Sequence, residues 1–304
     1  MDMYQKRNKR RETKDQREEE NMSKDVAINW FPGHMAKTKR KIKENIKLID
    51  VVIEVIDARL PLSSKIKDID DIIRTKKHVI VMTKKDLCDM KVTRKWVEHY
   101  ELKGASVVLL DLTNNKDYKE VYEAVEKQTK ELIEKRVEKG ISNKEIRALV
   151  VGVPNAGKST LINALAGKKV ANTGNKPGVT KQVNWLKTNN NLLLLDTPGI
   201  LWPKIDDKKV AINLASLTAI KSDVINITDI ANHIITYLVE YYPSILETRY
   251  KVNKEQDLLE IYEVIGKNIG ATKSGEVDYE KVAYKVYNDL ASGKISGVTF
   301  DTWK

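Results

Sequence analysis

A glycine-rich loop between an apolar segment and a helical one constrains the fold of this chain more than any other feature. Gly152–Ser159 reads GVPNAGKS, which matches the pattern G-x-x-x-x-G-K-[ST], and it directly follows the expected strand Arg147–Val151. In such a loop, glycines let backbone N–H groups approach an anion, and the N-terminus of the next helix adds a favourable dipole. The loop therefore predicts a phosphate-binding site at the end of a strand in an α/β sheet.

The side chains at the end of this loop have expected roles toward a nucleoside triphosphate. Lys158 brings a positive charge to the β- and γ-phosphates, and Ser159 is expected to ligate Mg²⁺. The loop residues expected to contact the nucleotide are Asn155, Ala156, Gly157, Lys158, Ser159 and Thr160.

A second motif, downstream of the loop, is expected to complete the metal site. The apolar strand Leu192–Leu195 ends in the sequence DTPG, which runs from Asp196 to Gly199. A carboxylate at this place supplies the second Mg²⁺ contact, and the Gly199 N–H can approach the γ-phosphate because glycine has no Cβ. Thr180 lies in a loop between the two motifs, and we expect its hydroxyl to complete the metal shell when triphosphate is bound.

The nucleotide base is expected to be read upstream of the loop. The apolar run Val79–Met82 is followed by TKKD, a near match to the guanine-reading signature N-K-x-D in which threonine replaces asparagine. The carboxylate of this motif can accept from N1–H and the exocyclic amine of guanine, whereas adenine would leave that charge unpaired, a difference of roughly 10⁴-fold in specificity. A guanine nucleotide, GTP or GDP, is therefore expected. The expected contacts are Thr83, Lys84, Lys85 and Asp86, with weaker backbone contacts from Asp111 and Leu112.

Alternating strands and helices predict a doubly wound, mostly parallel six-stranded sheet around these motifs. The expected strands are Val51–Ile56, His78–Met82, Ser106–Leu110, Arg147–Val151, Gln182–Lys187 and Leu192–Leu195. The helical patterns between them are Lys65–Arg74, Thr93–Glu101, Tyr118–Glu138 and Lys158–Leu165. Because no helix separates the last two strands, we expect them to form an antiparallel hairpin at one edge.

Changes in composition and hydrophobic pattern divide the chain into three expected parts. Residues 1–24 form a charged tail that we expect to be disordered, residues 25–203 a GTPase domain, and residues 204–304 a small all-helical C-terminal domain. The longest purely aliphatic run is Leu192–Leu195, far short of the roughly 18 residues of a membrane span. No apolar secretion signal is visible, and the one cysteine, Cys88, excludes a cysteine-ligated metal cluster. We therefore expect a cytoplasmic protein that does not span a membrane, and we also expect a monomer.

Positive charge is concentrated in the first two thirds of the chain. The net charge is +11, and residues 1–203 hold 41 Lys and Arg against 28 Asp and Glu. In the basic stretch Met35–Leu48, Ile42 and Ile46, with Ile49 just beyond it, recur at spacings of 4 and 3, so one face of a helix can pack. The cationic face is either an ordinary solvated surface or a contact for the phosphate backbone of nucleic acid. The candidate RNA contacts are Lys37, Arg40 and Lys41.

The order of the motifs predicts a circular permutation. In ordinary small GTPases the phosphate loop comes first, but here the base-reading motif at Thr83 precedes the loop at Gly152. The same strands can occupy the same places in the sheet if the old termini are joined and new ones are opened elsewhere. The expected fold is therefore a circularly permuted P-loop GTPase domain.

The chain resembles the ribosome biogenesis GTPase A family, whose circularly permuted members assist large ribosomal subunit assembly in bacteria. The resemblance covers roughly residues 26–304, and the segments that carry it are Asn29–Lys37, Asp57–Pro61, Gly152–Thr160, Pro177–Thr180 and Asp196–Pro203. It implies a C-terminal region that contacts ribosomal RNA and a protein that acts on a late large-subunit precursor. Ribosomal RNA and ribosomal proteins are then the expected partners.

Hydrolysis needs a group that replaces a missing glutamine. Ile200 occupies the position after the DTPG motif where small GTPases have the glutamine that orients water. The resemblance implies His34 as the catalytic residue, with activity that is slow alone and stimulated by the ribosomal particle. It also matches Asn155 to a residue that helps bind K⁺ in related GTPases.

Two other functions are compatible with these residues. One is a nucleotide-gated RNA-binding switch in which hydrolysis is incidental, which Ile200 favours. The other is a GTPase that serves tRNA modification or signalling, since the basic helix suits either role.

Overall fold

The computed structural model describes residues 33–66, 75–113, 118–141, 145–169, 184–188, 190–199, 205, 207–220, 224–273 and 275–303 of the chain. The charged tail 1–24, Thr180 and Ile200 lie outside the described residues. The side chains of residues 33–37 also lie outside them, which include those of His34 and Lys37. The division of the chain at residues 24 and 203 stays a prediction.

Six strands in the described part of the chain form one sheet with the order β3-β2-β1-β4-β6-β5. They are β1 (Val51–Asp57), β2 (Lys77–Thr83), β3 (Ser106–Leu110), β4 (Ile146–Gly152), β5 (Asn184–Lys187) and β6 (Leu192–Asp196). All neighbours pair in parallel except β5, which pairs antiparallel with β6 at the edge. The fourth strand in sequence, which leads into the glycine-rich loop, thus lies between β1 and β6. The mostly parallel sheet and the permuted order are confirmed.

Both faces of this sheet are covered, which explains the apolar texture of its central strands. Every residue of β1 is buried, and alternate residues of β2 belong to different apolar clusters. Ile80 and Met82 pack with Trp96 of α4 (Met90–Leu102), whereas Val79 and Val81 lie in the cluster that contains Val121 of α5 (Tyr118–Glu138). The two helices therefore lie on opposite faces.

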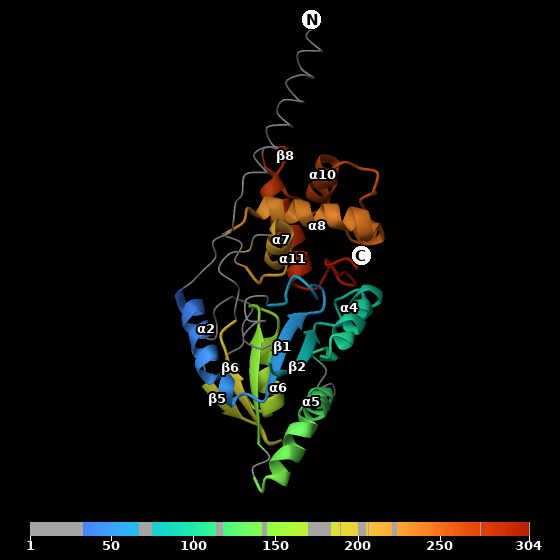
Figure 1. The fold of residues 1–304 in the computed structure, drawn as a ribbon. Helices are drawn as coiled ribbons and strands as arrows, with labels where there is room; N and C mark the ends of the chain where they lie inside the picture. Colours follow the sequence, from blue (N-terminus) through green and yellow to red (C-terminus); the bar gives the residue numbers. More distant parts are fainter. Residues whose placement is uncertain are drawn as a thin grey trace, which may run out of the picture.

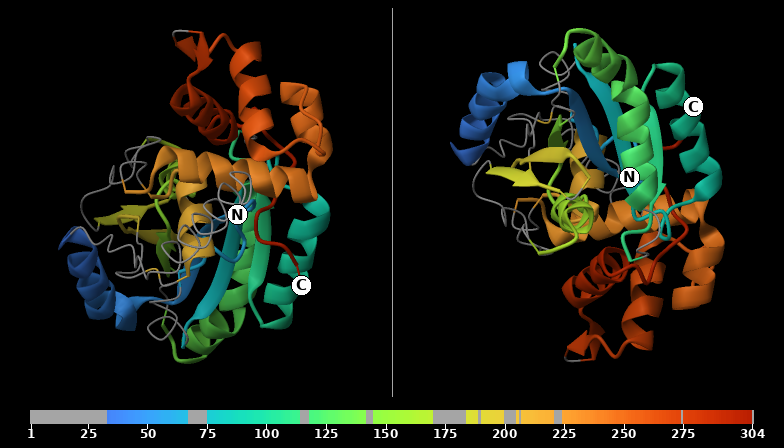
Figure 2. Two further views of the ribbon diagram at one scale, coloured as in Figure 1. Left: turned by 90° about the horizontal axis from the view of Figure 1, so that it is seen from above. Right: turned by 90° about the horizontal axis from the view of Figure 1, so that it is seen from below.

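The predicted basic helix is confirmed on the far flank of the molecule. It comprises α2 (Gly33–Asn45), followed by the short turn η1 (Ile46–Leu48), on the same side as β5 and β6 (Figures 1 and 2). Ile42 and Ile49 are buried in the core and Ile46 packs against it, while Arg40 is exposed. No helix in the described ranges is long and apolar enough to cross a membrane.

The expected helix Lys65–Arg74 is not confirmed at its start, and its remainder, residues 67–74, lies outside the described residues. Lys65 and Ile66 are not helical, and the Ile66 N–H donates to the Glu54 side chain at 2.9 Å. Helix α6 (Lys158–Ala166) begins where the sequence predicts, directly after the glycine-rich loop.

Helices dominate the chain after residue 207 and lie above the sheet in Figure 1. They are α7 (Lys208–Ser216), α8 (Ile227–Tyr241), α9 (Pro243–Tyr250), α10 (Leu258–Asn268) and α11 (Tyr279–Ala291). The expectation of an all-helical region is wrong in one detail, because β7 (Thr272–Lys273) and β8 (Glu276–Val277) pair as a small hairpin. Val277 packs so closely on α10 that a Cβ at Gly266 would lie 2.4 Å from it.

The chain after α11 returns to the sheet. The N–H groups of Gly297 and Val298 donate to the Leu87 carbonyl at 2.8 and 3.2 Å, just beyond β2. The Trp96 indole donates to the Asp301 carbonyl at 3.0 Å. One apolar cluster runs from Ile42 to Phe300. The helical region is therefore fixed at the carboxyl ends of β1 and β2.

Candidate functional site

The motifs that are scattered along the sequence meet at one edge of the sheet. Neighbouring parallel strands end in register, with Asp57 beside Thr83, Val55 beside Gly152 and Val150 beside Asp196. The carboxyl edge of an open parallel sheet is where such folds bind ligands. The structure therefore brings together the base-reading and phosphate-binding candidates and, of the metal-binding candidates, Ser159 and Asp196.

The glycine-rich loop is shaped by its neighbours. Gly157 has a φ of +88° and precedes the first residue of α6, so its backbone takes a conformation that favours glycine. A Cβ there would lie 2.8 Å from Leu112 Cδ1, which places the predicted Leu112 directly beside the loop. The loop thus has the helix N-terminus and the open backbone that anion binding requires. Ser159 and Thr160 follow in the first turn of that helix.

Lys158 and Asp196 form a buried ion pair inside this site. Lys158 Nζ lies 3.0 Å from Asp196 Oδ1, and both side chains are about one-twentieth exposed. Burial lowers the pKa of Lys158, although the charge of Asp196 opposes that shift. Two of the expected triphosphate and metal contacts are therefore neighbours in the structure.

The DTPG motif lies directly against the phosphate loop. A Cβ at Gly199 would lie 2.9 Å from Pro154 Cα, so only glycine fits between β6 and the loop without a shift. The Thr197 hydroxyl donates to the Val150 carbonyl at 2.8 Å and fixes the start of this segment to β4.

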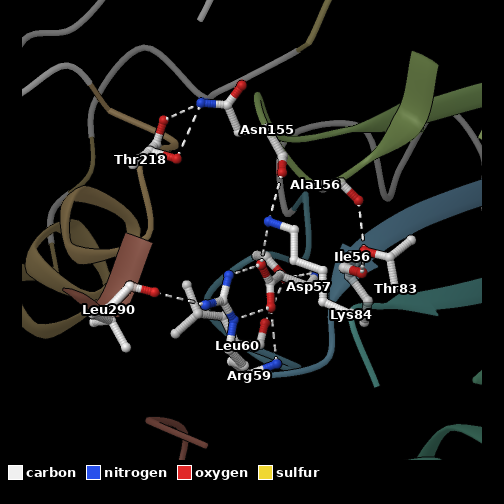
Figure 3. Close-up of polar contacts among 11 residues, drawn as sticks. Ile56, Asp57, Arg59, Leu60, Thr83, Lys84, Asn155, Ala156, Thr218 and Leu290 are labelled. Carbon is white, nitrogen blue, oxygen red and sulfur yellow. Dashed lines mark hydrogen bonds and ion pairs between the residues drawn. The ribbon is translucent and has the colours of Figure 1, made fainter. Parts of the chain in front are cut away.

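Thr83, the departure from the base-reading signature, is tied to the phosphate loop. Its side chain is fully buried, and its hydroxyl lies 2.7 Å from the Ala156 carbonyl and 3.2 Å from the Ile56 carbonyl (Figure 3). The Thr83 hydroxyl thus donates within the protein, to the backbone of the phosphate loop and of β1.

The other residues of the base-reading motif extend toward solvent from β2. Lys84 has a φ of +59° and donates from Nζ to the Asn155 carbonyl at 2.9 Å. Lys85 is half-buried and Asp86 is exposed. The Asp86 carboxylate is therefore accessible to a ligand. The Asp111 carboxylate accepts from the backbone and hydroxyl of Thr113 at 2.8 and 2.6 Å.

Sequence reasoning did not assign a role to Asp57 and Arg59, which lie in the same site. Asp57 Oδ2 lies 2.8 Å from Lys84 Nζ and 2.8 Å from an Arg59 guanidinium nitrogen (Figure 3). Burial alone would raise the pKa of Asp57, but the charges of Arg59 and Lys84 outweigh it and hold the pKa well below its ordinary value. The available signal was the sequence DARLP at the end of a strand, which the resemblance singled out without explaining it.

A contact from the helical region also reaches the loop. Asn155 Nδ2 donates to the carbonyl and hydroxyl of Thr218 at 2.7 and 3.1 Å, and Thr218 has a φ of +65° (Figure 3). Thr218 follows α7, and no pattern in the sequence indicated that it would lie beside the phosphate loop.

The RNA-contact candidates lie apart from this edge, on α2. Arg40 is exposed and pairs with Glu44 at 3.5 Å, and Lys41 is half-buried. His34 and Lys37 lie in the same helix, but their side chains are outside the described part of the chain.

Comparison with known proteins identifies relatives over nearly the whole chain. A family model described as 50S ribosome-binding GTPase matches residues 147–265. Ribosome biogenesis GTPase A of Bacillus cereus is 44% identical over 279 residues, which cover 91% of this chain and 94% of that protein. The protein of the same name from Thermotoga maritima is 31% identical over 275 residues, which cover 90% and 94%.

Two solved structures share the fold. A GDP-bound YlqF has a TM-score of 0.62 at 27% identity and covers 86% of this chain and 99% of its own. A GNP-bound YlqF from T. maritima has a TM-score of 0.60 at 27% identity and covers 88% and 98%. The motifs at the sheet edge are thus accompanied by similarity along about nine tenths of the chain. The chain belongs to the ribosome biogenesis GTPase A family.

Proposed function

We propose that this chain hydrolyses GTP in the cytoplasm and couples the reaction to a late step in the assembly of the large ribosomal subunit. The observation that carries the proposal is the meeting of the phosphate loop and the TKKD motif at one edge of the sheet, where Thr83 contacts Ala156 directly. A precursor particle, with its ribosomal RNA and proteins, is the proposed partner of the monomer.

The exposed Asp86 carboxylate would select guanine, since it can accept two hydrogen bonds from that base. Lys158 now pairs with Asp196. When the nucleotide binds, Lys158 would contact the phosphates instead, because they are also anionic and would lie at the N-terminus of the helix. Backbone N–H groups from Asn155 to Thr160, and the Gly199 N–H, would complete the phosphate contacts.

The donor set fits Mg²⁺, a cation that prefers oxygen ligands and keeps several waters. Ser159, Thr180 and Asp196 would hold it, and when bound it would neutralise charge that develops on the phosphate oxygens. No group of three or more His, Cys, Asp or Glu side chains in the described ranges forms a metal site by itself. A Mg²⁺ site with few protein ligands is expected where phosphate oxygens supply the remaining ligands.

His34 is the proposed catalytic residue, and docking of the basic helix on RNA would bring it to the γ-phosphate. GTP turnover should therefore rise when large-subunit precursor particles are added, and His34→Ala should remove most of that rise. Equal rates with and without particles would contradict this coupling. A rate that is unchanged when Na⁺ replaces K⁺ would remove the proposed K⁺ site at Asn155.

The basic face of α2 is the proposed contact with ribosomal RNA, through Lys37, Arg40 and Lys41. Co-sedimentation with precursor particles in a non-hydrolysable GTP analogue should weaken as salt rises, since phosphate contacts release counterions. The alternative function, a nucleotide-gated RNA-binding switch, is favoured by Ile200 and predicts the same binding without single-turnover hydrolysis on the particle.

A further inference from the structure

The side chain of Asp57 forms the centre of a charged cluster that joins three parts of the site. It lies at the end of β1 and is only 4% exposed. Both of its carboxylate oxygens accept from Arg59, at 3.0 Å from Nε and 2.8 Å from Nη2 (Figure 3). A carboxylate held in this two-point manner has a fixed orientation.

Lys84 takes up a position that this fixed carboxylate defines. Its ammonium group lies between Asp57 Oδ2, at 2.8 Å, and the Asn155 carbonyl, at 2.9 Å. The base-reading motif and the phosphate loop are therefore joined through one lysine side chain. The lysine has a φ of +59°, a strained conformation for a residue with a Cβ, so its placement depends on surrounding contacts.

Neutralisation of Asp57 does not by itself require the lysine. Arg59 already pairs with both carboxylate oxygens, and its remaining guanidinium nitrogen donates to the Leu290 carbonyl at the end of α11, at 3.3 Å. The second cation, Lys84, contacts both Asp57 and the phosphate loop. The contact between Asp57 and Lys84 is therefore suited to positioning Lys84 and not only to stabilising the fold.

We propose that Asp57 is a positioning residue of the nucleotide site, which holds the Lys84 ammonium against the Asn155 carbonyl and so aligns the base-reading motif with the phosphate loop before the nucleotide binds. The inference rests on the proposed nucleotide site and assigns a role to the DARLP segment. Arg59 orients the carboxylate and connects it to α11.

A double-mutant cycle on the full chain tests this role, with GDP binding followed by titration calorimetry. Asp57→Asn keeps the volume and removes the charge, and we expect it to weaken GDP binding about tenfold or more. Lys84→Met should weaken binding as well. In the Lys84→Met background, Asp57→Asn should have less than about a twofold further effect, because its partner is already absent.

Asp289→Asn is the matched control. Asp289 is a buried carboxylate in α11 that accepts from Arg249 at 2.8 Å and Lys285 at 3.0 Å, within the helical region. Urea unfolding of the nucleotide-free proteins should show a loss of stability for both Asp variants, whereas only Asp57→Asn should weaken GDP binding. If Asp57→Asn does not fold, Asp57→Glu replaces it, since it keeps the charge but displaces the carboxylate by one methylene.

The outcomes separate this inference from the proposed function. If the unmodified chain retains no guanine nucleotide, the proposed function fails and the inference fails with it. If the unmodified chain binds GDP, an Asp57 variant of unchanged affinity overturns the positioning role alone. Equal losses with and without Lys84 would also overturn it, since they would show that Asp57 acts only through the fold.

Discussion

At the scale of single residues, the phosphate loop depends on the absence of a side chain at Gly157. Gly157→Ala would combine a φ of +88° with a Cβ 2.8 Å from Leu112, so we expect GDP binding to be lost and stability to fall by about 1–3 kcal/mol. Gly104 has the same φ of +88°, but a Cβ added there would meet no atom within 4 Å, and it is the control. Gly104→Ala should cost about 1 kcal/mol and leave GDP binding unchanged. Equal GDP affinity in Gly157→Ala would contradict the loop geometry.

A second prediction at this scale concerns His233, whose Nε2 lies 2.8 Å from Asn213 Oδ1. Burial, with a smaller contribution from the charge of Lys209, lowers its pKa to about 4. The unfolded chain therefore binds the proton more tightly, and stability should fall as the pH drops from about 6.5 towards 4. His233→Gln should remove about 2 kcal/mol of this loss between pH 7.5 and pH 5, as measured by urea unfolding. A variant with the wild-type pH dependence would show that His233 does not titrate in this way.

At the scale of elements, the start of α4 connects the sheet to the helical region. Asp89 caps α4 by accepting from the Lys91 N–H at 2.8 Å, and it also accepts from the Tyr242 hydroxyl at 3.1 Å. Asp207 caps α7 by accepting from the Lys209 N–H at 2.9 Å. We expect Asp207→Ala to cost about 1 kcal/mol and Asp89→Ala about 2 kcal/mol, both by urea unfolding. Equal losses would show that the Tyr242 contact adds nothing to the cap.

The elements are also where sequence reasoning succeeded best. The six strands were predictable because they are short apolar runs, and the phosphate-loop helix because it directly follows the glycine-rich loop. The β7–β8 hairpin was not, because its two-residue strands are held by the contact of Val277 with Gly266 of α10, which no local pattern shows.

At the scale of the whole molecule, contacts between residues far apart in the sequence join the two regions. Asp301 accepts from the N–H groups of Leu62 and Ser63 at 2.8 and 2.6 Å and from Asn213 of α7 at 3.2 Å. Asp57, Arg59 and Thr218 were missed as site residues because their partners in the site are also distant in the sequence. Arg59 and Leu290, for example, are 231 positions apart, so only the folded chain shows their contact.

These contacts predict one cooperative unfolding transition. Circular dichroism and tryptophan fluorescence should follow the same urea curve, because the buried core is continuous from Ile42 to Phe300. Asp301→Ala would leave the buried Ser63 N–H and the part-buried Leu62 N–H without their acceptor and should lower stability by about 2–3 kcal/mol. Two separated transitions in the unmodified chain would contradict this coupling.

Nucleotide binding at this site requires two residues, Asp86 as the purine selector and Lys158 as the phosphate ligand. Titration calorimetry of the full chain with GTP and with ATP tests base selection and phosphate binding in one experiment. GTP should bind with Mg²⁺ present, and ATP should bind roughly 10⁴-fold more weakly. Equal affinity for the two nucleotides, or no retention of either, would contradict a guanine-nucleotide site at this edge of the sheet.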